Sequence, residues 1–297
     1  RVERRALGIA PGGQLDALTT VDRAPPSYSY ASTCTLTPSP MSADGLGLDE
    51  FYSAHALGNN LILVQGDATP AEQSQVTAIG AYDVKTCAFV AGGTIQPNML
   101  GDTWTPVPLA GWTAADPLKN LEYWALINAG GTVGVQRFDA TGQLLNTFAV
   151  QGASQVYYYY NGLTYDPVHD AFYGGLLPAG PDELRIAFKR PAAGATDDTV
   201  IQALVTPIPQ PCANTPPFIG VDAAGNSIFS QRDTGQKLRG CALTPTGELA
   251  DLPFDWSAQD GTSPTWGVLV PEDALYMLDV GVENSGVFSI DRYPLTP

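Results

Sequence analysis

Charged side chains are scarce in this sequence, because Asp, Glu, Lys and Arg together make up 15% of its 297 residues. A soluble helix needs such residues on its outer face, so their scarcity argues against a helix-rich domain. Turn-forming residues are abundant instead, with 31 Gly and 25 Pro, and 44% of the residues are hydrophobic. These features together predict a globular all-β chain built from many short strands.

Basic residues are the scarcest charged group, with 14 Lys and Arg against 30 Asp and Glu and a net charge of −16. Nucleic acid and anionic membrane surfaces are therefore unfavourable partners, since both bind through basic patches. No hydrophobic run approaches the length of a membrane-spanning helix, so we expect no membrane insertion. The acidic excess could attract Ca²⁺, although no EF-hand-like loop is present. We expect no cofactor, and Ca²⁺ stays an open alternative.

The sequence has four Cys and two His, and it lacks the C-x-x-C spacing of zinc sites. We therefore predict two disulfides, Cys34–Cys87 and Cys212–Cys241, with free buried thiols as the alternative. Disulfides indicate an oxidising compartment, and the sequence begins with Arg instead of Met. Both observations lead us to expect a secreted chain whose leader has been removed.

Several catalytic motifs are also missing from the sequence. It has no G-x-S-x-G nucleophile elbow, phosphate-binding loop, dinucleotide fingerprint or H-E-x-x-H pair. His55 and His169 are isolated, and we interpret both as structural or exposed residues. The sequence therefore favours a binding or structural role over catalysis.

The pattern that organises the chain is a β-hairpin at 133–150, VGVQRFDATGQLLNTFAV. Alternating apolar residues flank a turn centred on Gly142, which is typical of a hairpin. Similar segments recur at 238–256, around Gly247, and at 4–21, around Gly13. Further second hairpins are predicted at 78–95 and 184–208.

A second kind of strand pair comes before most of these hairpins, with turns of the Asp-Pro, Gly-Asn or Pro-Glu type. The pairs recur at intervals of about 50 residues. Asp116, Asp166 and Asp222 occupy matching positions in three of them, and such repetition favours a role in the turn. The five predicted pairs are 51–65, 112–127, 163–177, 218–230 and 266–280.

Four strands in each repeat resemble the blades of the β-propeller superfamily, and the resemblance covers essentially the whole chain. It implies a single domain, 1–297, with five blades. Six blades stay an alternative if 27–37 forms a degenerate blade, and a pair of β-sandwiches is a third possibility. We expect residues 1–21 to close the ring by pairing with the C-terminal unit, 263–297, because that unit is incomplete.

The propeller resemblance implies a functional site at one mouth of the central channel, on the loops that lead into the innermost strands. These loops are 43–51, 97–112, 151–162, 208–217 and 254–266, and they contain carboxylates and large aromatic residues. Each residue type also has a purely structural interpretation: an Asp next to Gly can stabilise a turn, and a Trp can pack in the core. The candidate ligand-binding residues are Asp49, Glu50, Asp102, Trp104, Tyr160, Asn161, Trp256 and Asp260.

Three functions are compatible with these candidates. The first is a secreted, non-enzymatic propeller that binds a carbohydrate or a surface protein through aromatic stacking and hydrogen bonds. The second is a glycoside hydrolase in which Asp49 or Glu50 faces Asp255 or Asp260, with or without Ca²⁺, because that reaction uses two carboxyl groups. The third is a structural module of an extracellular assembly. The oligomeric state is not predicted.

Overall fold

Every regular element in the described part of the chain is a β-strand, which confirms the predicted all-β class. Among the described strands and turns there is no helix that could cross a membrane. The computed structural model describes residues 7–9, 15–17, 32–36, 50–58, 60–68, 76–86, 88–95, 104–129, 132–154, 156–158, 163–178, 184–209, 218–222, 225–232, 238–250, 266–270, 274–280 and 288–294.

The first sheet is an antiparallel meander of four strands in chain order, and it contains the predicted hairpins 51–65 and 78–95. Its strands are β4 (Glu50–Leu57), β5 (Leu61–Ala68), β6 (Val76–Asp83) and β7 (Ala88–Ile95).

The second sheet has five strands, in the order β16-β11-β10-β9-β8. The predicted hairpin at 133–150 is confirmed as β10 and β11, which pair antiparallel. The fifth strand, β16, comes from later in the chain and pairs parallel with the outer edge of β11. The strands are β8 (Thr105–Pro108), β9 (Leu121–Ala129), β10 (Thr132–Asp139), β11 (Leu144–Ser154) and β16 (Val200–Gln202).

The third and fourth sheets contain the predicted pairs 163–177 and 218–230 and, as far as Ala250, the hairpin predicted at 238–256. The third sheet consists of β12 (Val156–Tyr158), β13 (Leu163–Asp166), β14 (Ala171–Pro178), β15 (Leu184–Lys189) and β17 (Leu204–Pro207). The fourth consists of β18 (Phe218–Val221), β19 (Ser227–Arg232), β20 (Leu238–Leu243) and β21 (Leu249–Ala250).

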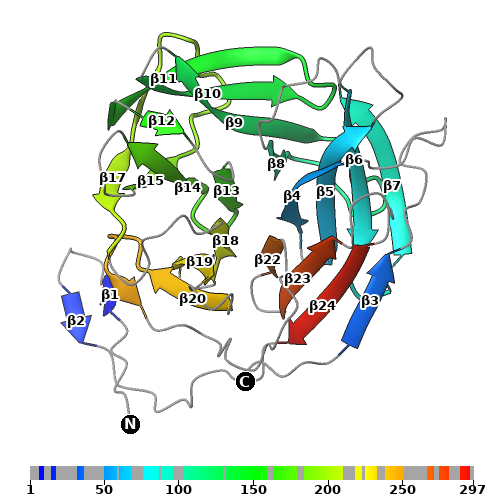
Figure 1. Ribbon diagram of the computed structural model, residues 1–297. Coiled ribbons are helices and arrows are strands. Elements are labelled where there is room, and N and C mark those ends of the chain that lie inside the picture. The colour runs from blue at the N-terminus through cyan, green and yellow to red at the C-terminus, as the bar shows by residue number, and fades with distance from the viewer. Residues whose placement is uncertain are drawn as a thin grey trace.

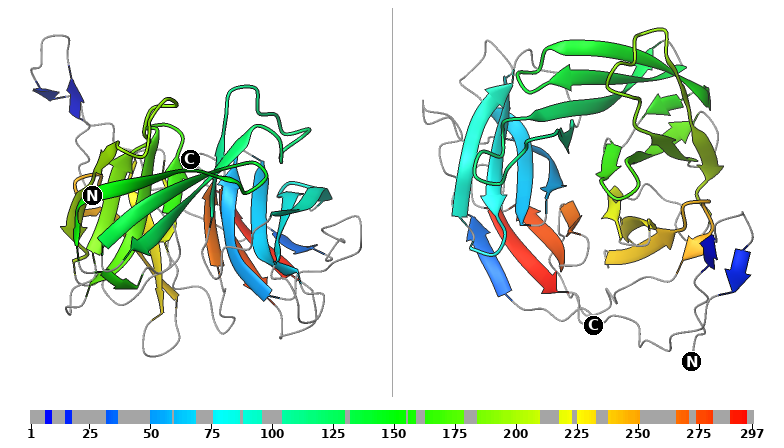
Figure 2. Two further views of the ribbon diagram at one scale, coloured as in Figure 1. Left: turned by 90° about the horizontal axis from the view of Figure 1, so that it is seen from above. Right: turned by 180° about the vertical axis from the view of Figure 1, so that it is seen from behind.

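The fifth sheet joins the two ends of the chain, but through a different segment from the one predicted. Its last strand is β3 (Ser32–Leu36), which pairs antiparallel with β24. The segment 1–21 instead provides β1 (Leu7–Ile9) and β2 (Leu15–Ala17), which pair with each other and lie outside the ring of sheets (Figures 1 and 2). The other strands of the fifth sheet are β22 (Trp266–Val270), β23 (Ala274–Val280) and β24 (Phe288–Pro294).

The five large sheets lie around a common axis, which is the architecture of a β-propeller (Figure 1). Their innermost strands contact one another in the order β4, β8, β13, β18, β22 and again β4. Five such sheets lie in the described part of the chain, and the number of blades in the whole chain stays a prediction. We call the side at which the innermost strands begin the entry face, and the side at which they end the exit face.

The predicted strand pair at 112–127 is wrong in its first half. The innermost strand is β8, at Thr105–Pro108, and residues 109–120 form turns on the exit face. This strand was not predicted because it contains Pro106 and Pro108, which lack the N–H group that a strand donates to its neighbour. An edge strand tolerates proline, since one side of it carries no ladder hydrogen bonds, and β8 is the edge strand of its sheet.

The turns of the later hairpins follow the predicted Gly-centred pattern. In the β10–β11 turn, the N–H of Gly142 donates to Asp139 O at 3.0 Å, and in the β20–β21 turn the N–H of Gly247 donates to Thr244 O at 2.9 Å. Both glycines have a positive φ, +85° and +92°. Glycine adopts this conformation without steric cost, so the aligned sequences fold into matching turns.

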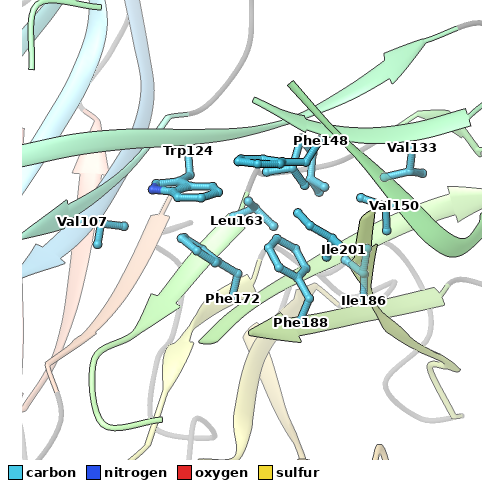
Figure 3. Packing of buried hydrophobic residues seen from close by; sticks show 12 residues of the cluster. Val107, Trp124, Val133, Phe148, Val150, Leu163, Phe172, Ile186, Phe188 and Ile201 are labelled. Atoms are coloured by element: carbon cyan, nitrogen blue, oxygen red, sulfur yellow. The ribbon is translucent and has the colours of Figure 1, made fainter. Parts of the chain in front are cut away.

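The hydrophobic core lies between neighbouring sheets, and both faces of β9 in the second sheet are buried in it. Trp124 and Leu126 of β9 face the third sheet, where they pack with Phe172 and Phe188 (Figure 3). Tyr123 and other residues of β9 face the first sheet and belong to a separate cluster. A blade with two apolar faces must stack on two neighbours, as the propeller resemblance implies.

Candidate functional site

Most of the residues predicted to form the channel mouth lie outside the described part of the chain. Glu50 begins β4, and its side chain is not among those described. The roles proposed for these residues therefore stay predictions. The residues outside the described part are Asp49, Asp102, Tyr160, Asn161, Asp255, Trp256 and Asp260.

Trp104 is the candidate whose side chain the structure does describe, and its predicted role as a ligand platform is wrong. It is 1% exposed and belongs to the cluster between the first and second sheets. Its ring stacks on Phe138 at a centroid distance of 4.8 Å and lies 5.6 Å from Tyr123. Trp104 is thus a packing residue, the alternative that the sequence left open.

Cys241 is the one cysteine whose side chain is described, and it is buried and not a free thiol. Cys87 and Cys212 lie outside the described residues, and Cys34 lies in β3. The predicted pairings Cys34–Cys87 and Cys212–Cys241 therefore stay predictions.

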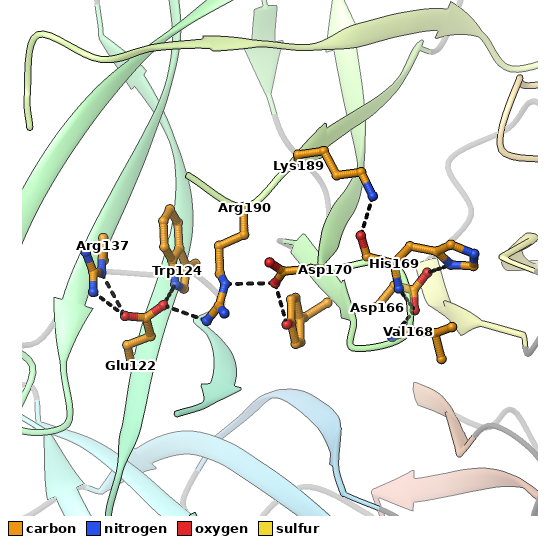
Figure 4. A network of polar contacts seen from close by, with 10 residues as sticks. Glu122, Trp124, Arg137, Asp166, Val168, His169, Asp170, Lys189 and Arg190 are labelled. Carbon is orange, nitrogen blue, oxygen red and sulfur yellow. Dashed lines mark hydrogen bonds and ion pairs between the residues drawn. The ribbon is translucent and has the colours of Figure 1, made fainter. Parts of the chain in front are cut away.

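The most extensive set of polar contacts in the described residues lies on the exit face, between the second and third sheets (Figure 4). We call it the exit-face network. It joins strand ends that are far apart in the sequence, and it consists of Glu122 of β9, Arg137 of β10, Tyr165 of β13, and Asp170 and Arg190, which flank β14 and β15.

Glu122 is the buried centre of the exit-face network, with a side chain that is 3% exposed. Arg137 donates to its Oε2 atom from both Nε and Nη2, each at 2.7 Å. Its Oε1 atom accepts from Trp124 Nε1 at 2.8 Å and from Arg190 Nη1 at 3.3 Å. A buried carboxylate is costly unless it is paired in this way, so the two guanidinium groups compensate for the burial of the Glu122 side chain.

Arg190 connects this buried centre to the surface. Its Nε atom donates to Asp170 Oδ1 at 2.8 Å, and the Tyr165 hydroxyl donates to the same oxygen at 2.7 Å. The guanidinium also lies 5.7 Å from the centre of the Tyr165 ring, which suits a cation–π contact. The pKa of Tyr165 is raised mainly by partial burial and, to a smaller extent, by the hydrogen bond to Asp170. Its hydroxyl therefore stays protonated and acts as a donor.

The repeated aspartates have the predicted turn role in two of the three places. Asp166 Oδ1 accepts from the backbone N–H groups of Val168 and His169, and Oδ2 contacts His169 Nδ1. Asp222 Oδ1 accepts from the backbone N–H of Asn226 at 2.8 Å. These contacts are Asx turns that fix the ends of innermost strands.

Arg185 is fully buried between the third and fourth sheets. Its Nε atom donates to Ser227 Oγ at 3.0 Å, its Nη1 atom donates to Pro245 O at 3.1 Å, and the guanidinium lies over the Tyr173 ring. Burial lowers the pKa of Arg185. Its contacts stay inside the interface, so we assign it to packing between the sheets.

His55 of β4 provides a test of burial that depends on pH. Desolvation lowers the pKa of His55 to about 3, and Nε2 has no hydrogen-bond partner among the described residues. Between pH 3 and the ordinary value of 6.5, the unfolded chain therefore binds more protons at this position than the folded chain. His55 thus contributes its full stability above pH 6.5 and loses it as the pH falls.

We expect the free energy of unfolding to fall by about 1.5 kcal/mol more between pH 6.5 and 5 in the wild type than in His55→Leu. Urea unfolding at both pH values measures this difference. The control is the range from pH 7.5 to 8.5, where the two proteins should change in parallel. Equal losses between pH 6.5 and 5 would show that His55 is not desolvated.

The exit-face network was missed because its members come from five different strand ends. One local signal was present: Glu122 and Trp124 alternate along β9, and the hairpin register places Arg137 opposite Trp124. The cationic side chain of Arg137 therefore lies across the strands from Glu122 and Trp124, which indicates a cross-strand ion pair with the Glu122 carboxylate. The pairing with Arg190 has no local signal, because it depends on how neighbouring sheets pack.

No metal site can be assigned within the described residues, where no group of three or more His, Cys, Asp or Glu side chains is arranged to hold an ion.

Comparisons with known proteins give likeness of fold alone. No family pattern and no curated protein matches the sequence. Among solved structures, the chain is similar to TolB from Acinetobacter baumannii, with 12% identity, a TM-score of 0.40 and coverage of 82% of this chain and 54% of TolB. The chain thus spans about half the length of TolB.

Two other solved structures cover most of the chain. One is an α-L-arabinofuranosidase from Podospora anserina in complex with cellotriose, with 7% identity, a TM-score of 0.48 and coverage of 90% of this chain and 96% of that one. The other is the β-propeller domain of the Trilobed protease from Pyrococcus furiosus, with 8% identity, a TM-score of 0.36 and coverage of 79% and 80%. Identities this low say nothing about ligand or activity.

Proposed function

We propose that this chain is a secreted binding propeller and that its ligand is a carbohydrate. The observation that carries the proposal is the surface end of the exit-face network. There, a 53% exposed carboxylate, Asp170, and a partly exposed guanidinium, Arg190, are fixed beside the ring of Tyr165. Sugar recognition uses a few polar groups of this kind next to an aromatic side chain.

Preorganisation supports a binding role for this surface. Arg190 is held from behind by the buried Glu122, so ordering it on binding costs little conformational entropy. Secretion is supported by the predicted disulfides, and the proposal places the protein in an oxidising compartment. A surface protein as the ligand is an outcome that the experiment below can distinguish.

The test is incubation with a mixed panel of neutral oligosaccharides, with bound and free fractions both identified by mass spectrometry. We expect intact glycans in the bound fraction. Shortened products that disappear in an Asp49→Asn, Glu50→Gln double variant would overturn the proposal in favour of a glycoside hydrolase. An empty bound fraction would also overturn it, and would direct the search to protein partners.

A further inference from the structure

Two polar groups at the surface of the exit-face network have hydrogen-bonding capacity left over. Arg190 uses Nε and Nη1, and Asp170 uses Oδ1 for both of its side-chain contacts. Arg190 Nη2 and Asp170 Oδ2 have no partner among the described residues. In a planar guanidinium, Nη2 shares an edge with Nε, so the unused donor lies on the side of Asp170.

We infer that this donor and this acceptor bind two adjacent hydroxyl groups of an uncharged sugar ring. One hydroxyl donates to Asp170 Oδ2, while the oxygen of its neighbour accepts from Arg190 Nη2. A hydroxyl can act in either role, so a vicinal diol matches a fixed donor–acceptor pair. This inference rests on the proposed function and names the ligand group that the same surface recognises.

The two side chains are fixed relative to each other by the backbone as well as by their ion pair. The N–H of Arg190 donates to Asp170 O at 3.0 Å, directly beyond the paired strands β14 and β15. Tyr165 holds the carboxylate from a second direction, through the bond from its hydroxyl to Oδ1. A rigid pair of this kind selects a ligand by the spacing of its hydroxyl groups.

The charges of the exit-face network favour an uncharged ligand. Two carboxylates, Glu122 and Asp170, balance two guanidinium groups, Arg137 and Arg190. An acidic sugar would gain from Arg190 but would be repelled by Asp170, and an amino sugar would meet the reverse. The net charge of −16 for the whole chain further disfavours an anion.

The test uses three neutral probes, the methyl pyranosides of glucose, mannose and galactose, with glucuronic acid and glucosamine as charged probes. Binding is measured by NMR titration. We expect the wild type to bind at least one neutral probe. Its affinity for the charged probes should be lower by a factor of about ten or more. Asp170→Asn and Arg190→Lys should each weaken binding of the neutral probe by about tenfold, because each removes a charge-assisted hydrogen bond.

Asp198→Asn is the matched control, since Asp198 is also an exposed aspartate, in the connection between β15 and β16, and lies outside the network. It should bind as the wild type does. Circular dichroism of each variant checks that the fold is kept. If the wild type binds a sugar and both network variants bind it equally well, the inference is wrong while the proposed function stands. If the oligosaccharide panel also gives no binding, both are wrong.

Discussion

Glu122→Gln lowers the free energy of unfolding by about 3 kcal/mol, which is the first of the two largest effects that we expect. Gln keeps the size of the side chain but removes its charge, so the largely buried guanidinium of Arg137 loses its anionic partner. Removing one member of a buried ion pair leaves an uncompensated charge, and this is more costly than removing both. Urea unfolding followed by circular dichroism measures the loss.

The matched control for Glu122→Gln is Asp116→Asn, the same acid-to-amide change in an exposed ion pair with Lys119. Exposed pairs contribute little, so this variant should lose less than about 1 kcal/mol. Adding Arg137→Met to Glu122→Gln should recover part of the loss, because both charges are then absent. A loss for Glu122→Gln no larger than that for Asp116→Asn would contradict the buried pairing.

Phe172→Ala is the second large effect, with an expected loss of about 4 kcal/mol. The Phe172 ring is fully buried and lies 5.0 Å from Trp124, 5.2 Å from Tyr165 and 5.2 Å from Phe188, measured between ring centres. The substitution removes apolar contacts with both the second and the third sheet and leaves a cavity between them. Urea unfolding again measures the change.

Phe172→Leu should lose clearly less than Phe172→Ala, because Leu fills most of the same space. Val168→Ala, at a side chain that is 66% exposed, should change the free energy of unfolding by no more than about 0.5 kcal/mol. If Phe172→Ala behaves like Val168→Ala, the aromatic cluster does not hold the two sheets together.

The sequence was sufficient wherever a strand pairs with its immediate neighbour in the chain. The alternation in 133–150 and the glycine of its turn predicted β10 and β11, because hairpin geometry depends only on local residues. The same reasoning failed at β8, whose two prolines are typical of a loop and are tolerated because the strand lies at an edge.

The sequence was insufficient for contacts that ring formation creates. Nothing near Ser32–Leu36 indicates β24 as its partner, and nothing near Val200–Gln202 indicates a parallel pairing with β11. The exit-face network has the same origin, since Glu122 and Arg190 meet only when two sheets stack. Trp104 could not be assigned from its residue type, which is compatible with both ligand binding and packing. Its burial in the structure identifies it as a packing residue.

The strands β3 and β16 each pair with a strand that is distant in the sequence. These pairings set the order in which the sheets can be completed during synthesis. β11 emerges from the ribosome with its outer edge open, and that edge stays open until Val200–Gln202 follow. β3 must wait longer, because its partner β24 follows much later in the chain. Open strand edges are where nascent chains associate wrongly, so we expect β3 and the outer edge of β11 to be exposed to such association until β24 and β16 have been made.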